Sequence, residues 1–423
     1  MATHIQHTAH AVEPAALMGL LPARPRLLAL GEPTHGEDAL LTVRNDLFRR
    51  LVEEEGYRTI AIESDCLKAG IVDAYVTTGT GTPGPAPRID LGLDIDIDLD
   101  IDIDIDEVMA TGFSHGWGAA AGNRELVEWL RTHNEGRPRA EQVRFAGFDG
   151  PLEIHAAESP RQALAALHAY LAAHVDRDLL PCTAKTLEHL LGPDGRWTDP
   201  AAMLDPSRSV GRSPEAAELR LLADDLTALL EVQAPHLIAA TSPEDVERAR
   251  LHGRTALGLL RYHHGMADAS PARLTRLVGT RDQMMADNLL ALAERGPTLV
   301  HAHNSHLQRT RSTMTMGGAP LRWWSAGALV SARLGEEYAY VATALGTLPH
   351  QGVDAPPPAT LEGLLYELPG DRSLVDNRHL AAHLGGALPQ PRVSPWFGYA
   401  PLDPGQLSDS DALVFVRDVV RGG

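Results

Sequence analysis

The sequence predicts an α/β fold in which a mostly parallel β-sheet core is flanked by helices and carries a largely helical cap. Four short apolar runs that end in polar residues are typical of buried parallel strands, and they cover residues 26–32, 58–64, 143–149 and 297–303. A long Ala/Leu-rich stretch with helical periodicity separates the third run from the fourth. In such a fold, ligands bind beyond the carboxyl ends of the strands.

The first strand is followed by a helix. Leu40, Leu47 and Leu51 recur at helical spacing after residues 26–32, and Gly56 marks the end of the helix before the next strand. This pattern predicts a βαβ unit, which is the building block of a parallel sheet.

The order of the patterns predicts one domain with an insertion. Residues 1–150 and 296–423 are expected to form the sheet core, because two more strand-like runs, 337–346 and 411–419, follow the helical stretch. Residues 151–295 are expected to form a helical cap inserted in the same domain.

Composition and charge exclude several classes of partner. The formal net charge of −19 would repel a phosphate backbone or an anionic membrane surface, and no Lys/Arg cluster offsets it locally. No apolar run approaches the roughly 18 residues that span a bilayer. Two cysteines, and a start without a basic, apolar leader, favour the cytoplasm. A small molecule is the expected partner, and the oligomeric state is not predicted.

One segment is of low complexity, with Asp at every even position from Asp94 to Asp106. Seven carboxylates on one face of a strand would repel one another, so we interpret the repeat as a solvated insertion. A calcium site is the alternative, but calcium loops need turns and mixed ligands rather than strict alternation.

Titratable side chains follow all four predicted core strands. Because the carboxyl ends of parallel strands meet at one edge of a sheet, these residues are expected to line an active-site cleft. They are Glu32, His35, Glu63, Asp149, His303 and His306.

His35 is the first candidate for a catalytic base. Pro33 stiffens the turn and Gly36 frees it, so that the imidazole is presented ahead of a helix. With an ordinary pKa near 6.5, His35 is expected to be largely neutral at pH 7. Glu32 or Glu63 would orient the ring; a hydrogen-bonded loop histidine without catalytic function is the alternative.

Arg44 falls on the same apolar stripe as Leu40 and Leu47, where a charge needs a partner. We therefore expect it to contact a carboxylate, such as Glu32 or Glu63, or to polarise a carbonyl as an oxyanion develops. The alternative is an arginine whose head reaches solvent at the edge of the helix.

Three histidines, His301, His303 and His306, lie close together in HAHNSH. They can supply a second acid or base, and with His35 they provide enough imidazoles for a zinc site. Their spacing matches no common ligand pattern, so we favour a metal-free acid/base pair that needs no cofactor, with a divalent metal as the alternative.

Residues 112–116, GFSHG, match the G-x-S-x-G pattern of a serine nucleophile, which would pair Ser114 with Asp149 and His303. That motif needs a hydrophobic strand directly before the serine, and here the Asp repeat and EVMAT precede it. We interpret the segment as a Gly-rich loop that enters the helix NRELVEWLRTHN.

These residues resemble the erythromycin esterase family over nearly the whole chain. The main pieces are GEPTHGE with Arg44 nine residues after His35, and AIES with Glu63; RELVEWLRTHN, VRFAGFDGP, RDQMMADN, HAHNSH and DALVFV resemble later blocks. The chain departs from the family in its Asp-rich insert and in Pro33, where a small residue is common.

The resemblance implies a cleft where water is activated to open a macrolactone, without an acyl-enzyme. It implies that His35 is the base, Glu32 and Glu63 its acidic partners, and Arg44 an essential arginine. Arg281 and a histidine of HAHNSH would act from the second side, and the resemblance leaves open whether that is His303 or His306. We expect His303 to be catalytic, and His306, Arg281 and Asp149 to bind substrate.

The sequence therefore predicts a hydrolase that cleaves a macrolactone or another bulky ester, with antibiotic inactivation as one use. Two alternatives remain. One is a protein that sequesters such a ligand without turnover, and the other is a metal-dependent or ring-modifying biosynthetic enzyme on the same scaffold.

Overall fold

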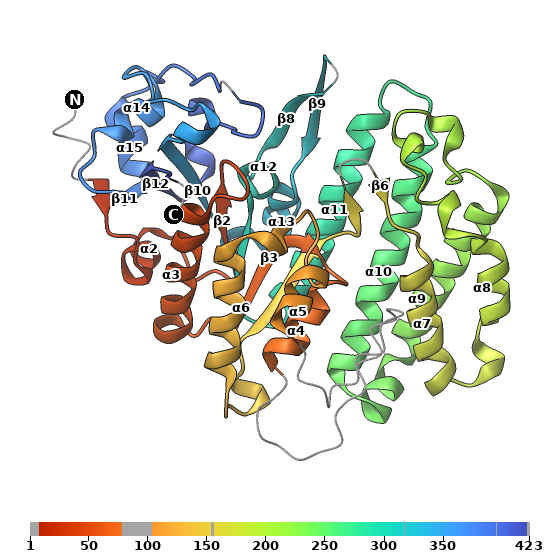
Figure 1. Cartoon of the computed structure of the whole chain (residues 1–423). Coiled ribbons are helices and arrows are strands. Elements are labelled where there is room, and N and C mark those ends of the chain that lie inside the picture. The colour runs from red at the N-terminus through yellow and green to blue at the C-terminus, as the bar shows by residue number, and fades with distance from the viewer. Residues whose placement is uncertain (1–7, 78–103, 154–155, 317, 395, 421–423) are drawn as a thin grey trace.

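A computed structural model describes residues 8–77, 104–153, 156–316, 318–394 and 396–420, and its centre is an eight-stranded sheet (Figure 1). The five central pairings are parallel, and the two at the β1 edge are antiparallel. The prediction of a mostly parallel sheet is thus confirmed. In spatial order the strands are β1 (Ala9–His10), β11 (Arg372–Asp376), β12 (Ala412–Asp418), β10 (Tyr338–Thr347), β2 (Leu27–Glu32), β7 (Thr298–His303), β3 (Thr59–Asp65) and β4 (Arg144–Asp149).

Helices cover both faces of this sheet. On one face, Leu47, Phe48 and Leu51 of α3 pack in the same buried cluster as sheet residues such as Leu28 and Ile60. The helices of this face are α2 (Pro14–Leu20), α3 (Asp38–Glu55), α4 (Ala69–Thr77), α5 (Ile105–Thr111) and α6 (Ala121–Asn134). The other face is covered by α11 (Arg273–Ala293) and α13 (Ala326–Leu334).

The predicted βαβ unit is present as β2, α3 and β3. Gly56 ends α3 in the left-handed conformation, with φ of 71°, and the N–H of Tyr57 returns to the carbonyl of Leu51. Glycine carries no Cβ, so it adopts this conformation at little cost and turns the chain into β3.

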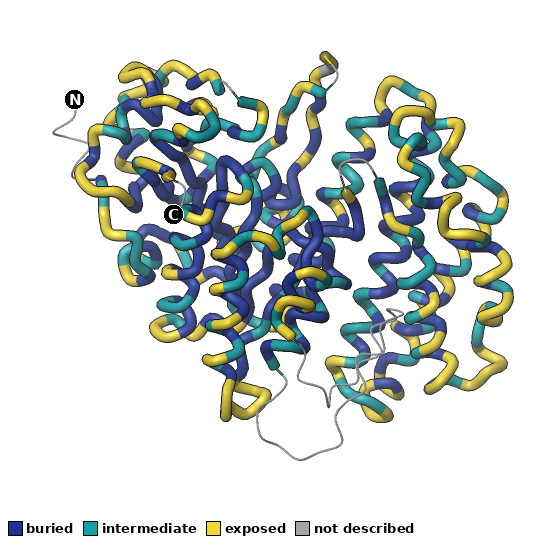
Figure 2. The backbone as a smooth tube through the Cα atoms, viewed as in Figure 1, coloured by how far each residue is buried: buried dark blue, intermediate teal, exposed yellow. Residues whose placement is uncertain are grey.

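A group of helices lies beside the sheet and has a leucine-rich core of its own (Figures 1 and 2). It comprises α7 (Arg161–His174), α8 (Ala184–Leu191), α9 (Pro214–Ala240) and α10 (Pro243–Met266). Helix α11 contacts both α10 and the sheet side, where Met285 and Leu289 are buried against strand residues. The last helix of the segment 151–295 therefore connects the helical group to the sheet.

Several elements carry no clear sequence pattern. The hairpin of β8 (Arg311–Met316) and β9 (Ala319–Trp324) rises between the two halves of the molecule (Figure 1). The remaining short elements are β5 (Leu152–Glu153), β6 (Ala156–Ala157), α12 (Asn304–Leu307), α14 (Leu361–Tyr366) and α15 (Asn377–Leu384).

Most of the Asp repeat lies outside the described residues. Its last residues begin α5, where Asp104 caps the helix by accepting a hydrogen bond from the N–H of Asp106. Among the helices that the structure describes, none is both long enough and apolar enough to cross a bilayer.

Asn304, directly after β7, joins two strands that do not pair with each other. Its Nδ2 donates to the carbonyl of Thr343 in β10 over 2.8 Å, and its Oδ1 accepts from the N–H of Thr343 over 3.2 Å. The amide passes the end of β2 at Gly31, where a Cβ would lie 2.0 Å from Oδ1 of Asn304. Gly31 therefore makes room for the contact that joins the chain after β7 to the middle of β10.

Candidate active site

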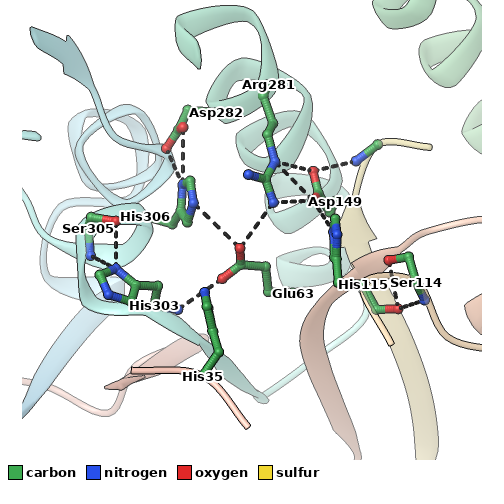
Figure 3. A network of polar contacts seen from close by, with 12 residues as sticks. His35, Glu63, Ser114, His115, Asp149, Arg281, Asp282, His303, Ser305 and His306 are labelled. Atoms are coloured by element: carbon green, nitrogen blue, oxygen red, sulfur yellow. Dashed lines mark hydrogen bonds and ion pairs between the residues drawn. The ribbon is translucent and has the colours of Figure 1, made fainter. Parts of the chain in front are cut away.

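The polar residues predicted at the strand ends lie together in the structure (Figure 3). Glu32 ends β2 and His303 ends β7, while Glu63 lies near the end of β3 and Asp149 ends β4. Because β2, β7, β3 and β4 are neighbours in the sheet, their side chains meet at its carboxyl edge.

His35 lies in the turn between β2 and α3, with Gly36 after it at φ of 76°. Its Nδ1 is 2.7 Å from Oε1 of Glu32, and its ring centroid is 4.9 Å from that of Trp117 and 5.2 Å from that of His303. The side chain is 34% exposed, and within the described residues its Nε2 has no hydrogen-bond partner. One ring nitrogen is thus anchored and the other is open to an incoming molecule.

Glu32 is anchored on its far side by a second histidine. Its Oε2 lies 3.2 Å from Nε2 of His301, whose Nδ1 lies 3.1 Å from the carbonyl of Leu30. A carbonyl oxygen only accepts, so Nδ1 of His301 carries a proton. Burial opposes ionisation, but His301 and His35 hold the pKa of Glu32 well below its usual range, so it is a carboxylate.

The two carboxylates strongly change the titration of His35. Burial would lower its pKa, but the charge of Glu63 and the hydrogen bond and charge of Glu32 raise the pKa of His35 to about 9. The expectation of a largely neutral ring at pH 7 is therefore wrong, because the residues that orient the imidazole also bind its proton. Only roughly 1% of such a group is unprotonated at pH 7.

Glu63 connects the two sides of the site. Its Oε1 accepts from Nη2 of Arg281 over 3.0 Å and lies 3.5 Å from Nε2 of His306, and its Oε2 accepts from the N–H of His303 over 2.9 Å. Its backbone carbonyl accepts from Nε1 of Trp117. Burial opposes ionisation, but His306, His35 and Arg281 keep the pKa of Glu63 well below its usual range.

His303 differs from His35 in its protonation. The N–H of Ser305 donates to Nδ1 of His303 over 3.2 Å, and Oγ of Ser305 lies 2.7 Å from the same atom. Nδ1 is therefore an acceptor, and the proton of the neutral ring sits on Nε2, which has no hydrogen-bond partner in the described part of the chain. Burial and the charge of His35 lower the pKa of His303 to about 4, so this ring is neutral at pH 7.

His306 is engaged at both nitrogens. Its Nδ1 lies 3.1 Å from both oxygens of Asp282, and its Nε2 faces Glu63. Burial opposes protonation, but Asp282 and Glu63 raise the pKa of His306 above its usual value. Asp282 also accepts from Nε1 of Trp323 and the N–H of Ala326. Sequence reasoning missed Asp282; its position beside Arg281 in RDQMMADN was the available signal.

Arg281 and Asp149 form the opposite wall. Nε and Nη2 of Arg281 donate to Asp149 over 2.6 to 3.1 Å, and Nη2 also reaches Glu63. The fully buried Asp149 accepts as well from the N–H of Gly150. Asp149 thus has no free oxygen for substrate, whereas Nη1 of Arg281 makes no hydrogen bond within the residues described.

His115 is a second residue that sequence reasoning missed. Its Nε2 lies 3.0 Å from Oδ2 of Asp149, and its Nδ1 lies 2.8 Å from Oε2 of Glu153. Its φ of 56° is the one positive value among the described residues other than glycine, and such strain concentrates at functional sites. The sequence signal for His115 was the GFSHG segment, in which the serine matched a known motif and the histidine did not.

Ser114 itself is not placed as a nucleophile. It is buried, its Oγ accepts from the N–H of Asp65 over 2.8 Å, and its N–H donates to Oγ of Ser64. None of its hydrogen bonds involves a histidine. The interpretation of residues 112–116 as a structural loop agrees with these contacts.

Arg44 is buried, but the expectation that it contacts a carboxylate is wrong. Its guanidinium donates to Oδ1 of Asn45 and Asn123 and to the carbonyl of Gly122. Amide oxygens satisfy the donors without a second buried charge. Burial lowers the pKa of Arg44 to about 10, with the charge of Glu32 opposing this from a distance. Arg44 joins α3 to α6 beneath Glu32 rather than facing substrate.

The histidines do not converge on a common point. His301 faces Leu30 and Glu32, His306 faces Asp282 and Glu63, and His303 faces Ser305. Within the described residues no group of three His, Cys, Asp or Glu side chains has the arrangement of a metal site.

Comparisons with known proteins concern the family and the fold of the chain. The family model described as erythromycin esterase matches residues 52–419, which leaves Glu32, His35 and Arg44 before the matched region. A solved protein of Bacillus cereus is 17% identical with a TM-score of 0.71 over 99% of this chain and 97% of its own. A succinoglycan biosynthesis protein is 17% identical, with a TM-score of 0.68 over 99% and 96%. A mutant of the erythromycin esterase EreC in its open conformation is 17% identical, with a TM-score of 0.63 over 97% and 94%. At this identity the three structures share the fold.

Proposed function

From the premise that the chain belongs to the erythromycin esterase family, we propose that it hydrolyses a bulky ester or macrolactone with water activated by His35. The observation that carries the proposal is the asymmetry of the His35 ring. Nδ1 is fixed on the buried carboxylate of Glu32, and Nε2 is open. This is the geometry that a general base needs, since the carboxylate stabilises the imidazolium formed in the reaction.

The proposed reaction needs no covalent intermediate. Nε2 of unprotonated His35 takes a proton from water as the water oxygen attacks the ester carbonyl carbon, which gives a tetrahedral oxyanion. The C–O bond to the alcohol then breaks, and the imidazolium of His35 returns the proton to the leaving oxygen. Acid and alcohol are released, and the ring is neutral again.

Two donors are available for the oxyanion. The proton on Nε2 of His303 is free in the described structure, and so is Nη1 of Arg281. Burial, reinforced by the charge of His35, lowers the pKa of His303, and its Nδ1 already accepts from Ser305, so we assign it as a hydrogen-bond donor and not as a second base. Donors fixed before the reaction stabilise the developing charge without reorganisation.

The other predicted residues hold His35, His303 and Arg281 in position. Glu63 accepts hydrogen bonds from Arg281 and from the backbone of His303. The polar side-chain atoms of His306 and Asp149 are bonded to other protein groups. We therefore assign His306 and Asp149 as positioning residues and not as substrate ligands. Arg44 supports the helix pair beneath the site.

The test is a mass-spectrometric screen of macrolides and simple lactones at pH 9 in ¹⁸O-labelled water. We expect at least one compound to gain one water, with the label in the new carboxylate, and His35→Gln to give no product. A compound that is retained tightly but unchanged would overturn hydrolysis in favour of sequestration. Loss of turnover on adding EDTA would overturn the metal-free reaction.

A further inference from the structure

A pocket on the helical side of α11 has a charge opposite to that of the chain as a whole. It has a volume of about 310 Å³ and lies between α9, α10 and α11, away from the sheet. Four arginines and one carboxylate line it, in a chain whose net charge is −19. The lining residues used in this argument are Arg212, Arg220, Arg261, Asp268, Arg276 and Gly279.

The single carboxylate does not neutralise this cluster. Asp268 pairs with Arg212 over 3.3 Å and with Arg276, and both of its oxygens also accept from Ser270. Neither Arg220 nor Arg261 forms an ion pair within 4 Å in the described part of the chain, although the charge of Arg261 acts on Asp287 from a greater distance. Arg261 is exposed and Arg220 is half-buried, and neither guanidinium donates a hydrogen bond within the described residues, so both are available to an anion that enters the pocket.

The pocket is distinct from the candidate active site. Arg276, Gly279, Thr280 and Gln283 are spaced three, four and seven residues apart and so share one face of α11. Arg281 and Asp282 lie on a different face of the same helix and contact Glu63 and His306. Helix α11 therefore directs Arg281 and Asp282 toward the sheet side, whereas its pocket face carries Arg276 and three uncharged residues.

We propose that this pocket binds a small, multiply charged oxyanion of the phosphate class. Guanidinium groups match phosphate oxygens with paired hydrogen bonds, and an excess of positive charge in a concave site concentrates small anions. A long polyanion is disfavoured because the remaining surface is acidic. A bound phosphate would join α9, α10 and α11 through Arg220, Arg261 and Arg276.

Gly279 offers a way to close the pocket without changing its charge. A Cβ built on Gly279 would have no atom within 4 Å, so a larger side chain can enter the pocket without a clash. Leucine is also a better helix former than glycine. Gly279→Leu is therefore expected to fold at least as stably as the parent while occupying the space of the anion.

The experiment is isothermal titration of the full chain with pyrophosphate at constant ionic strength, together with the change in melting temperature. We expect saturable binding to one site and a rise in melting temperature. Arg220→Gln with Arg261→Gln should weaken binding by roughly tenfold or more, since paired charged hydrogen bonds are lost. Gly279→Leu should abolish binding.

The matched control is Arg248→Gln, which removes an arginine of α10 that pairs with Asp245, roughly 20 Å along the helix from Arg261. It should bind pyrophosphate like the parent. Equal weakening in Arg248→Gln, or unchanged binding in Gly279→Leu, would overturn the pocket as the site. Tighter binding of citrate than of pyrophosphate would overturn the phosphate class.

Discussion

The two sides of the candidate active site use the same residue types in different ways. On the side of β2 and β7, His35 and His303 each have one ring nitrogen anchored and one open. On the side of α11, which contacts His306 of α12 through Asp282 and Asp149 of β4 through Arg281, both nitrogens of His306 and both oxygens of Asp149 are taken by protein groups. The first side can exchange protons with a substrate, whereas the second side holds charges in place.

In a buried charged cluster, reactive and supporting residues differ in whether a polar atom is left without a protein partner. His35 and His306 both lie beside carboxylates, and both have a raised pKa. Their titration therefore does not distinguish them, but the partner of the second nitrogen does. The following experiments test that distinction.

His35→Gln should have the largest effect on the rate. Loss of the base is expected to lower kcat/KM by about 10² to 10⁴-fold, which is the usual contribution of a general base. At pH 10, above the raised pKa of His35, the melting temperature should change little, since the neutral ring adds no ion-pair stability and is partly exposed. Steady-state kinetics and calorimetry on the same sample measure both; a large loss of stability would place His35 among the supporting residues.

Asp282→Ala should show the opposite pattern, with its main effect on stability. It leaves Nδ1 of His306, Nε1 of Trp323 and the N–H of Ala326 without their acceptor. Breaking a buried pair of this kind costs about 3–5 kcal/mol, which urea unfolding measures.

Asp287→Ala, on the same helix, is the control and should cost far less. If Asp282→Ala and Asp287→Ala lowered the free energy of unfolding equally, the contacts of Asp282 would not be what stabilises this side of the site.

The pH dependence should link the rate to His35. Because the unprotonated ring is the base and its pKa is about 9, kcat/KM should rise by about 50-fold from pH 7 to pH 9. Since the pKa of His35 is raised by folding, its contribution to stability is complete below pH 6.5 and is lost as the pH rises through 9. As the pH rises from 7 to 9, kcat/KM should therefore increase while the free energy of unfolding decreases.

Glu32→Gln removes one carboxylate from His35 and should shift this rate profile to lower pH. A structural role alone would lower the rate without moving the profile. An unchanged midpoint would show that Glu32 does not set the titration of His35.

Ser114→Ala should have the smallest effect. It removes one acceptor for the N–H of Asp65, at a cost of about 1–3 kcal/mol in stability, and it should leave kcat/KM nearly unchanged. Labelling of Ser114 by a fluorophosphonate, blocked in the variant, would restore the serine hydrolase interpretation.

The central strands and the first helix were predictable because their signals are local. Apolar runs and helical spacing located β2, α3 and β3, and the polar residues after each strand met because parallel strands end at one edge. The antiparallel strand β11, which lies between β1 and β12, and the separate β8–β9 hairpin were missed, since short strands depend on their neighbours more than on their own sequence.

Contacts between segments that are distant in the sequence explain why parts of the site were predicted wrongly. His115 acquires its role only when the chain brings Asp149 and Glu153 to it, and Arg44 is satisfied by amides 78 and 79 residues away as well as by its neighbour. The titration of His35 depends on Glu63 from another strand. None of these pairings leaves a periodic or spacing signal in the sequence.

The amide of Asn304, which reaches across Gly31 to Thr343, limits how this protein can be redesigned. His35 follows β2 and His303 ends β7, and between them this amide ties the chain after β7 to β10. A side chain at position 31 would collide with the amide, so a change there would disturb the segment that carries His303. Variation aimed at a new substrate should therefore keep Gly31 and Asn304 and begin with the β8–β9 hairpin, which lies outside the main sheet.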